Sequence, residues 1–171
     1  MSNRIASMVS WLIVIWISKV FLFSLPYKFS GHPDTQHIFG TIGAWIKDIL
    51  GSAMGDAFTQ YGAYAVGTME LVTSLILLAP ALIWLIQRNN KGPNLPSRNI
   101  LHGLGGLIAA GIMCGAAFFH LATPLGIEVL HEGQSDNGSL FYAAVSIIFF
   151  GAILFVINYL NWAASKAAPN R

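Results

Sequence analysis

Apolar residues occur in four long stretches of this chain, separated by short segments rich in polar residues, Gly and Pro. The stretches cover residues 8–25, 61–86, 102–122 and 140–162, and the first and third end close to Pro26 and Pro124. A helix needs about 20 mostly apolar residues to cross the hydrocarbon core of a bilayer. The pattern therefore predicts an all-α fold, a four-transmembrane-helix bundle that forms a single integral membrane domain over residues 1–171.

The connection between the first two stretches carries a helical pattern of its own. Within residues 37–54, apolar residues recur at intervals of three and four, which is typical of one face of a helix. They are Ile38, Phe39, Ile42, Trp45, Ile46, Ile49 and Leu50. We therefore expect an extra amphipathic helix in this first connection. Two roles are open: it lies on the membrane surface, or it covers a pocket in the bundle.

Composition agrees with a membrane protein and excludes several classes of function. Of the 171 residues, 55% are hydrophobic and 9% are charged, whereas soluble domains contain about 25% charged residues. The net charge of +2 comes from residues scattered over short connections rather than from a basic stripe, so we expect no nucleic-acid partner. Cys114 is the single cysteine. One chain therefore cannot perform thiol–disulfide relay chemistry without a second sulfur from a partner.

The charges of the connections predict an orientation. Basic residues occupy the termini and the middle connection, and acidic residues occupy the third connection. The basic residues are Arg4, Arg88, Lys91, Arg98, Lys166 and Arg171, and the acidic ones are Glu128, Glu132 and Asp136. Because cytoplasmic loops carry the excess of Lys and Arg, both termini are predicted to be cytoplasmic and the first connection extracytoplasmic. The membrane we expect is the bacterial inner membrane.

Small residues in the third stretch predict close helix packing. Gly111 and Gly115 form a GxxxG step, and Gly106, Ala110 and Cys114 form a second row spaced four residues apart. Small residues let helix backbones approach closely in a bilayer. We therefore expect both rows to face neighbouring helices, with Cys114 in the core.

Three ionisable residues, Lys19, Glu70 and His120, lie inside apolar stretches. A charge at membrane depth costs about 2.5–3.5 kcal/mol on insertion scales, so such residues usually face the bundle interior and have a partner. Helix rise places all three in the outer half of the bilayer, and the Lys19 stem is long enough to reach Glu70. The expectation is a buried Lys19–Glu70 ion pair. It either holds two helices in register, or Glu70 accepts protons in a catalytic site with Lys19 and His120.

Other residues complete the candidate site. Phe119 and Tyr142 are candidates for an apolar ligand cavity beside His120, with His37 of the first connection as a further ligand-binding residue. A metal site is not favoured, because the histidines and acids show no zinc-type spacing. Haem is not favoured either, because His102 and His120 stand at opposite ends of one stretch.

Three short motifs connect the chain to a known family. They are Lys28-Phe29-Ser30-Gly31, the segment IFGTIG at residues 38–43, and Gly67-Thr68-Met69-Glu70-Leu71. With the four-span layout, these motifs resemble the DoxX-like family of small four-helix membrane proteins, in which a G-x-x-E-L pattern opens an apolar second helix. Gly67, Glu70 and Leu71 match that pattern. The longer first connection and the acidic, histidine-bearing third connection depart from the commoner members.

The resemblance implies little chemistry by itself. Some members are similar to subunits of membrane oxidoreductase complexes, including a thiosulfate:quinone oxidoreductase, and others assist maturation or redox defence. Our leading hypothesis is a membrane subunit or anchor of an oxidoreductase complex, with a membrane or extracytoplasmic redox partner protein and a quinone-type ligand in the outer half of the bundle. Two alternatives stay open: an accessory, maturation or lipid-handling protein, and a stand-alone enzyme that uses Lys19, Glu70 and His120 on a lipophilic substrate.

Overall fold

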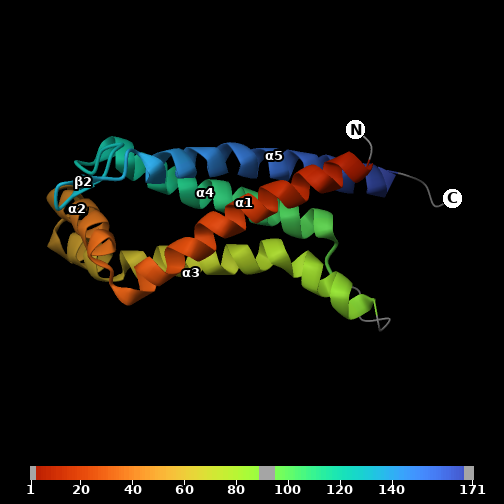
Figure 1. Ribbon diagram of the computed structural model, residues 1–171, viewed down its shortest axis with the longest axis horizontal. Coiled ribbons are helices and arrows are strands. Elements are labelled where there is room, and N and C mark those ends of the chain that lie inside the picture. Colours follow the sequence, from red (N-terminus) through yellow and green to blue (C-terminus); the bar gives the residue numbers. More distant parts are fainter. Residues whose placement is uncertain (1–2, 89–94, 168–171) are drawn as a thin grey trace.

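A computed structural model describes residues 3–88 and 95–167, so that Lys91 and Arg171, which support the predicted orientation, lie outside the described residues. These residues form five helices and one short hairpin (Figure 1). The helices are α1 (Asn3–Ser30), α2 (Pro33–Leu50), α3 (Ser52–Gln87), α4 (Arg98–Ala122) and α5 (Ser139–Ala167), and the hairpin pairs β1 (Leu130–His131) with β2 (Gln134–Ser135). Four of the helices, α1, α3, α4 and α5, are long and apolar enough to span a membrane, as predicted.

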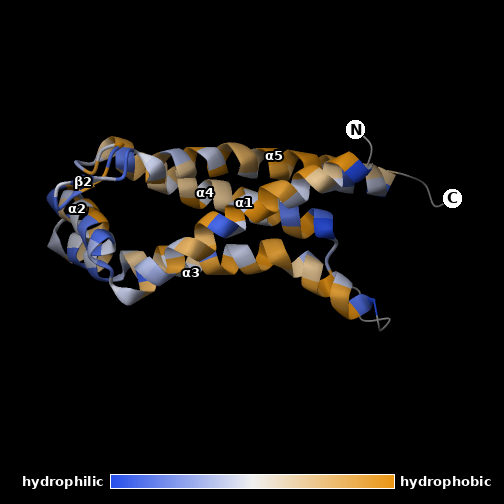
Figure 2. Ribbon diagram, in the orientation of Figure 1, coloured by the Kyte–Doolittle hydropathy of each residue, from blue (hydrophilic) through white to orange (hydrophobic). Residues whose placement is uncertain are grey.

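The four long helices run along the long axis of the molecule. In Figure 1, α4 lies beside α5, α3 lies on the opposite side, and α1 crosses obliquely between them. Both ends of the chain lie at one end of the molecule, and α2 and the hairpin lie at the other. Figure 2 shows apolar residues along the long helices and hydrophilic residues concentrated towards the two ends, as expected for a membrane protein.

The core lies between the long helices. Ile17 and Phe21 of α1, Leu77 of α3, and Ile147 and Leu154 of α5 are fully buried in one cluster. Spacings of three and four residues along α1 place its buried residues on one face, because such residues are neighbours on a helix surface. This face continues towards the polar end of α1 and determines which of its charged side chains point inward.

The structure changes the predicted boundaries of the first connection. Helix α1 continues through Pro26 to Ser30, and α3 begins at Ser52, so the connection is helical almost throughout. Gly31 (φ +69°) and Gly51 (φ +90°) form the two corners in backbone conformations that residues with a Cβ rarely adopt. The prediction of a long connection that contains one short helix was wrong in extent, because turns this tight need only single glycines.

Helix α2 packs back on α3 and covers one end of the molecule. A Cβ atom at Gly43 would lie 2.9 Å from the Gly55 carbonyl oxygen, so the two backbones touch where α2 and α3 meet. On either side of Gly43 in α2, Ile42 and Ile46 pack with Leu125 and Val129 in a second apolar cluster. This cluster joins α2 to the segment between α4 and α5, on the opposite side of the bundle from α3.

The two rows of small residues in α4 behave differently. A Cβ at Gly106 would lie 2.8 Å from the Gly151 carbonyl oxygen of α5, so the predicted close contact exists there. No atom lies within 4 Å of a Cβ built at Gly111 or Gly115, and Cys114 is exposed. The predicted GxxxG contact within the chain and the core position of Cys114 were therefore wrong. Gly111 points about 140° away from Gly106 around the helix, and α5 covers only the Gly106 side.

Candidate functional site

The buried carboxylate of Glu70 in α3 is held by two residues of α1. The Lys28 Nζ atom lies 2.9 Å from Glu70 Oε2 and 3.2 Å from Oε1. The Ser24 hydroxyl donates a hydrogen bond of 2.7 Å to Oε2. The exposed fraction of the side chain is 3% for Glu70 and 16% for Lys28, so the ion pair is almost removed from solvent. We call these three residues the Ser24–Glu70–Lys28 centre.

The predicted Lys19–Glu70 ion pair was wrong. Lys28 holds the place assigned to Lys19, because α1 extends one turn beyond Pro26 and carries Lys28 into the bundle. Phe21, Ser24 and Lys28 follow one another at intervals of three and four on the buried face of α1. Lys19 lies two residues before Phe21, which turns it to the other side of the helix, and it is exposed.

Sequence reasoning missed Lys28 and Ser24, although a signal for them was present. The buried spacing from Ile17 to Phe21 continues at Ser24 and Lys28, beyond the proline that was taken as the end of the helix. A proline in a spanning helix is tolerated when neighbouring groups satisfy the freed backbone. Continuing the 3–4 spacing past Pro26 would have identified both residues.

Two of the family-like motifs meet at this centre. A Cβ at Gly67 would lie 3.1 Å from the Phe29 ring and 3.4 Å from the Lys28 Cβ atom. The absence of a side chain at Gly67 therefore lets the end of α1 approach α3 closely. One helical turn further along α3, Glu70 binds Lys28. The motif at residues 28–31 and the motif at residues 67–71 are far apart in the sequence, and the structure places them against each other.

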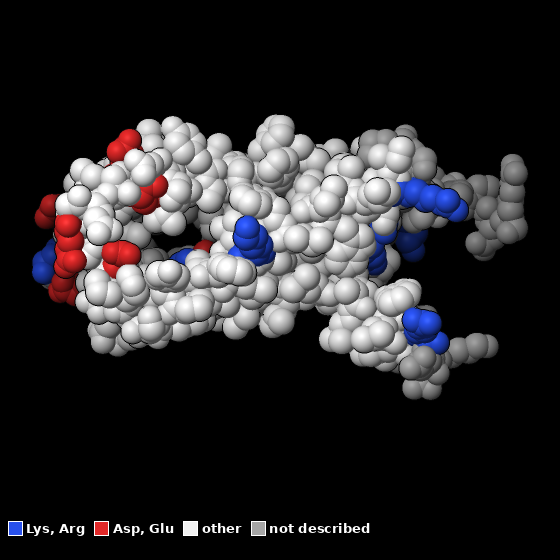
Figure 3. Space-filling model, viewed as in Figure 1, with Lys and Arg blue, Asp and Glu red and all other residues white. Residues whose placement is uncertain are grey.

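Open space is found in two places. A pocket of about 170 Å³ lies between α1, α2 and α3 and is lined by Lys28, Gly31, Phe39 and Tyr64 among others. In addition, Figure 3 shows the molecule hollowed between α3 and α5, near the end with the acidic residues, and charged atoms of both signs are visible inside. We call this second space the flank hollow. It opens on a side of the molecule parallel to the long helices.

His120 is buried near the end of α4, where it contacts the segment that follows. Its Nδ1 atom lies 2.7 Å from the Gly126 carbonyl oxygen, which can only accept, so Nδ1 is the donor. Its ring meets the Phe141 ring edge-on, with centroids 5.8 Å apart. Within residues 3–88 and 95–167, no hydrogen bond or ion pair joins His120 to Glu70 or Lys19. The structure thus gives His120 a contact that fixes a turn.

The three residues predicted to bind a ligand lie in three different surroundings. Phe119 packs against the rings of Trp45 and Phe58 beneath α2. Tyr142 is 62% exposed on α5. The ring of His37 stacks on the ring of His131, with centroids 4.6 Å apart.

Histidines and an aspartate tie the start of α2 to the hairpin. Asp34 Oδ1 lies 2.8 Å from His131 Nδ1, and Asp34 Oδ2 lies 3.4 Å from His32 Nδ1. These contacts are largely exposed. No group of three or more His, Cys, Asp or Glu side chains in the described part of the chain is arranged to hold a metal ion.

Asp136 organises the turn before α5. Its carboxylate accepts hydrogen bonds from the backbone N–H groups of Val129 (2.8 Å), Gly138 (3.0 Å) and Leu140 (3.0 Å). Burial alone would raise the pKa of Asp136, but these backbone hydrogen bonds, with one from the Ser139 hydroxyl, outweigh it and lower the pKa below its ordinary value. The ionised carboxylate therefore stabilises this turn.

Protein-family models, curated proteins and solved structures contain no significant match to this chain.

Proposed function

We propose that this protein is a DoxX-like membrane subunit of an oxidoreductase complex, which binds the head group of a quinone-type lipophilic ligand beside the Ser24–Glu70–Lys28 centre. The observation that carries the proposal is the centre itself: a nearly fully buried, hydrogen-bonded ion pair that borders a pocket. The meeting of two DoxX-like motifs at this place supports the family relationship. The pocket is smaller than the roughly 300–1,000 Å³ typical of small-molecule sites, so only a compact head group fits inside it.

The residues of the centre have the chemistry that such a head group requires. A quinone presents two carbonyl oxygens and, when bound, takes up two electrons and two protons. The Lys28 ammonium has three N–H donors, of which one is hydrogen-bonded to Glu70 Oε1, and Lys28 lines the pocket. We propose that Lys28 donates to a carbonyl oxygen in the pocket, while the Glu70 carboxylate fixes the position of Lys28.

Lys19 supports the proposal of a membrane partner. It is exposed on α1 among large exposed apolar side chains, which include Ile15, Leu22 and Phe23. An ammonium group against lipid is costly, and membrane-embedded charges usually pair with another group. We propose that a carboxylate on a spanning helix of the redox partner covers Lys19, and that this partner supplies the electrons.

The charge distribution supports an orientation in the bacterial inner membrane. All seven acidic residues fall within residues 34–70 and 128–136, and Figure 3 shows the acids gathered at the end that α2 covers. The positive-inside rule places the opposite end in the cytoplasm, with both termini. In this orientation α2 is an amphipathic extracytoplasmic helix that caps the bundle.

Ligand extraction tests the proposed function. The full-length chain is purified in mild detergent, and bound quinone is measured by mass spectrometry. We expect quinone with the wild type and a large loss with Lys28→Met and with Glu70→Gln. Lys47→Met is the matched control, because it breaks an exposed ion pair, Lys47–Asp56 (3.1 Å), whose lysine does not line the pocket. Equal quinone content in all four proteins would refute binding at the centre.

Cysteine labelling tests the orientation separately. In a Cys114→Ser background, a cysteine at Ser135 should react with an impermeant reagent added to intact cells, and a cysteine at Ser97 should react only after the membrane is opened. Labelling of position 97 in intact cells would reverse the assignment.

A further inference from the structure

The pocket beside the Ser24–Glu70–Lys28 centre follows one face of α3. A Cβ atom built at Gly67 would lie 3.4 Å from the Lys28 Cβ atom, so Lys28 stands close to the level of Gly67. Gln60 precedes Gly67 by seven residues, or almost two helical turns, which places both on the same face of α3 about 10 Å apart along its axis. Gln60 lines the pocket together with Lys28, and Ala63 and Tyr64 line it between these two levels. The pocket therefore has an ammonium group at one end and a carboxamide at the other.

The Gln60 side chain is exposed, and the fold does not use its amide. No hydrogen bond among the described residues involves the Gln60 side chain, whereas the second glutamine of the pocket, Gln36, donates to the Gly31 carbonyl oxygen at 2.8 Å. A carboxamide has two N–H donors and one acceptor oxygen. Gln60 can therefore bind a ligand atom without giving up a contact of the protein.

We propose that Gln60 binds the second carbonyl oxygen of the quinone head group whose first carbonyl oxygen binds Lys28. The role of Gln60 rests on the proposed function and narrows its ligand class to para-quinones. A para-quinone carries its two oxygens on opposite sides of the ring, so it meets a donor at each end of the pocket. The ring itself would lie between Phe39 and Tyr64, which line the pocket between its ends, as apolar walls commonly do in small-molecule sites.

The two donors differ in what they can bind. An ammonium group only donates hydrogen bonds, whereas a carboxamide both donates and accepts. A quinone oxygen accepts a hydrogen bond, and the corresponding hydroxyl of the reduced hydroquinone can also donate one. Gln60 therefore binds its ligand oxygen in both redox states, through its N–H groups in one and through its carbonyl oxygen in the other.

The test measures binding of tetramethyl-para-benzoquinone and of its hydroquinone by equilibrium dialysis, with the full chain at one fixed ratio of detergent to protein. This quinone has no lipid tail, and its fully substituted ring has no open position for addition of the Cys114 thiol. The hydroquinone is measured without oxygen. Gln60→Met should weaken the binding of both forms several-fold, up to about tenfold, as expected for the loss of one hydrogen bond.

Gln60→Glu separates a ligand contact from a structural role. The two side chains have nearly the same shape, but an ionised carboxylate accepts hydrogen bonds and cannot donate them. Gln60→Glu should therefore weaken binding of the quinone at least as much as Gln60→Met does, and leave binding of the hydroquinone close to that of the wild type. Because Gln60 is exposed, we expect both variants to fold like the wild type.

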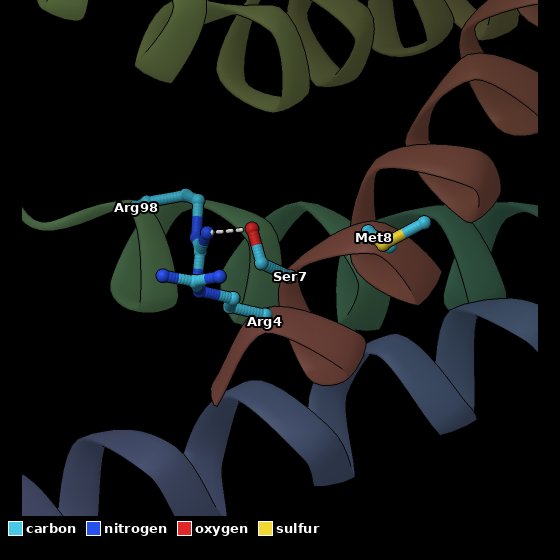
Figure 4. A pocket seen from close by; sticks show the side chains of 4 residues that line it. All are labelled: Arg4, Ser7, Met8 and Arg98. Atoms are coloured by element: carbon cyan, nitrogen blue, oxygen red, sulfur yellow. Dashed lines mark hydrogen bonds between the residues drawn. The ribbon is translucent and has the colours of Figure 1, made fainter. Parts of the chain in front are cut away.

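Two control variants locate the binding. Gln87→Met makes the same change at the opposite end of α3 and should leave binding unchanged. An open space of about 570 Å³ at the N-terminal ends of α1 and α4, where Arg98 Nη1 donates to the Ser7 hydroxyl, is large enough to admit a tail-free ring (Figure 4). Met8 lines that space, so Met8→Ala should leave binding unchanged. A loss with Met8→Ala as large as with Gln60→Met would place the quinone there instead.

The outcomes for Gln60 and for the proposed function are distinct. A wild type that binds neither form would overturn both. If the wild type binds the quinone and Lys28→Met abolishes binding, while both Gln60 variants bind like the wild type, the proposed function stands and the role of Gln60 is refuted. An equal loss of quinone and hydroquinone with Gln60→Glu would also refute the contact, because a merely structural effect does not distinguish the two redox states.

Discussion

Removal of Lys28 should destabilise the protein far more than removal of Lys19, although both are lysines of α1. In Lys28→Met, the Glu70 carboxylate stays buried and keeps only the Ser24 hydroxyl as a donor. Breaking a buried ion pair from one side costs about 3–5 kcal/mol. For Lys28→Met we expect the free energy of unfolding to fall by about 3 kcal/mol, the lower end of this range, because the hydrogen bond from Ser24 to Glu70 remains.

Replacing Glu70 instead of Lys28 should lower the free energy of unfolding by a smaller amount. In Glu70→Gln, the Lys28 ammonium loses its partner, but its side chain is 16% exposed and borders the pocket, so it can turn towards water on its flexible stem. We expect a loss of about 1–2 kcal/mol, of the size of one hydrogen bond to a charged group. The double variant should be no less stable than Lys28→Met alone, because removing both charges can be nearly neutral.

The assay is unfolding in mixed micelles with increasing SDS, for the wild type, both single variants, the double variant and Lys19→Met. With a double loss no larger than that of Lys28→Met, the single losses give a coupling energy between Lys28 and Glu70 of at least about 1–2 kcal/mol. The Lys19→Met control should cause no loss of stability, because an ammonium group against lipid is itself unfavourable. Additive effects of the two single changes would refute the contact. A loss with Lys19→Met as large as with Lys28→Met would refute the assignment of the inward face of α1.

Three further predictions concern packing and turns. Asp136→Ala should destabilise the protein by about 0.5–2 kcal/mol through lost capping. Because the folded-state pKa of Asp136 is lowered, its contribution to stability should be complete above the ordinary pKa of 3.8 and disappear as the pH falls through the lowered pKa. If the substitution leaves the pH dependence of the thermal unfolding midpoint unchanged, this reasoning is wrong. Gly106→Val should cost about 1–3 kcal/mol by overpacking against α5, whereas Gly111→Val, with open space around it, should be neutral in the same SDS titration, and equal costs would count against the packing. His120→Ala should cost about 0.5–1.5 kcal/mol by removing the bond to Gly126 and leave the quinone content unchanged; a strong loss of quinone would place His120 at the ligand instead.

The number of long helices followed from the sequence, because an apolar run of sufficient length is a local property. The partner of Glu70 could not be predicted in the same way, because it depends on where α1 ends. A helix that stops at Pro26 does not include Lys28, whereas α1 continues through Pro26. Helix α1 ends at Ser30, and the next residue is Gly31, whose positive φ is visible only in the structure. Similarly, the two glycine rows of α4 look alike in sequence, and only the position of α5 decides that Gly106 is packed and Gly111 is not.

The flank hollow determines how a ligand would be supplied. It opens beside the long helices rather than at an end of the bundle (Figure 3), so a molecule with a long apolar tail that entered through it would come from the lipid phase and leave its tail there. Occupancy then follows the mole fraction of the ligand in the surrounding membrane, not its concentration in water. A rising ratio of detergent to protein should therefore lower the occupancy by dilution with every protein contact intact, which is why the wild type and its variants are compared at one fixed ratio.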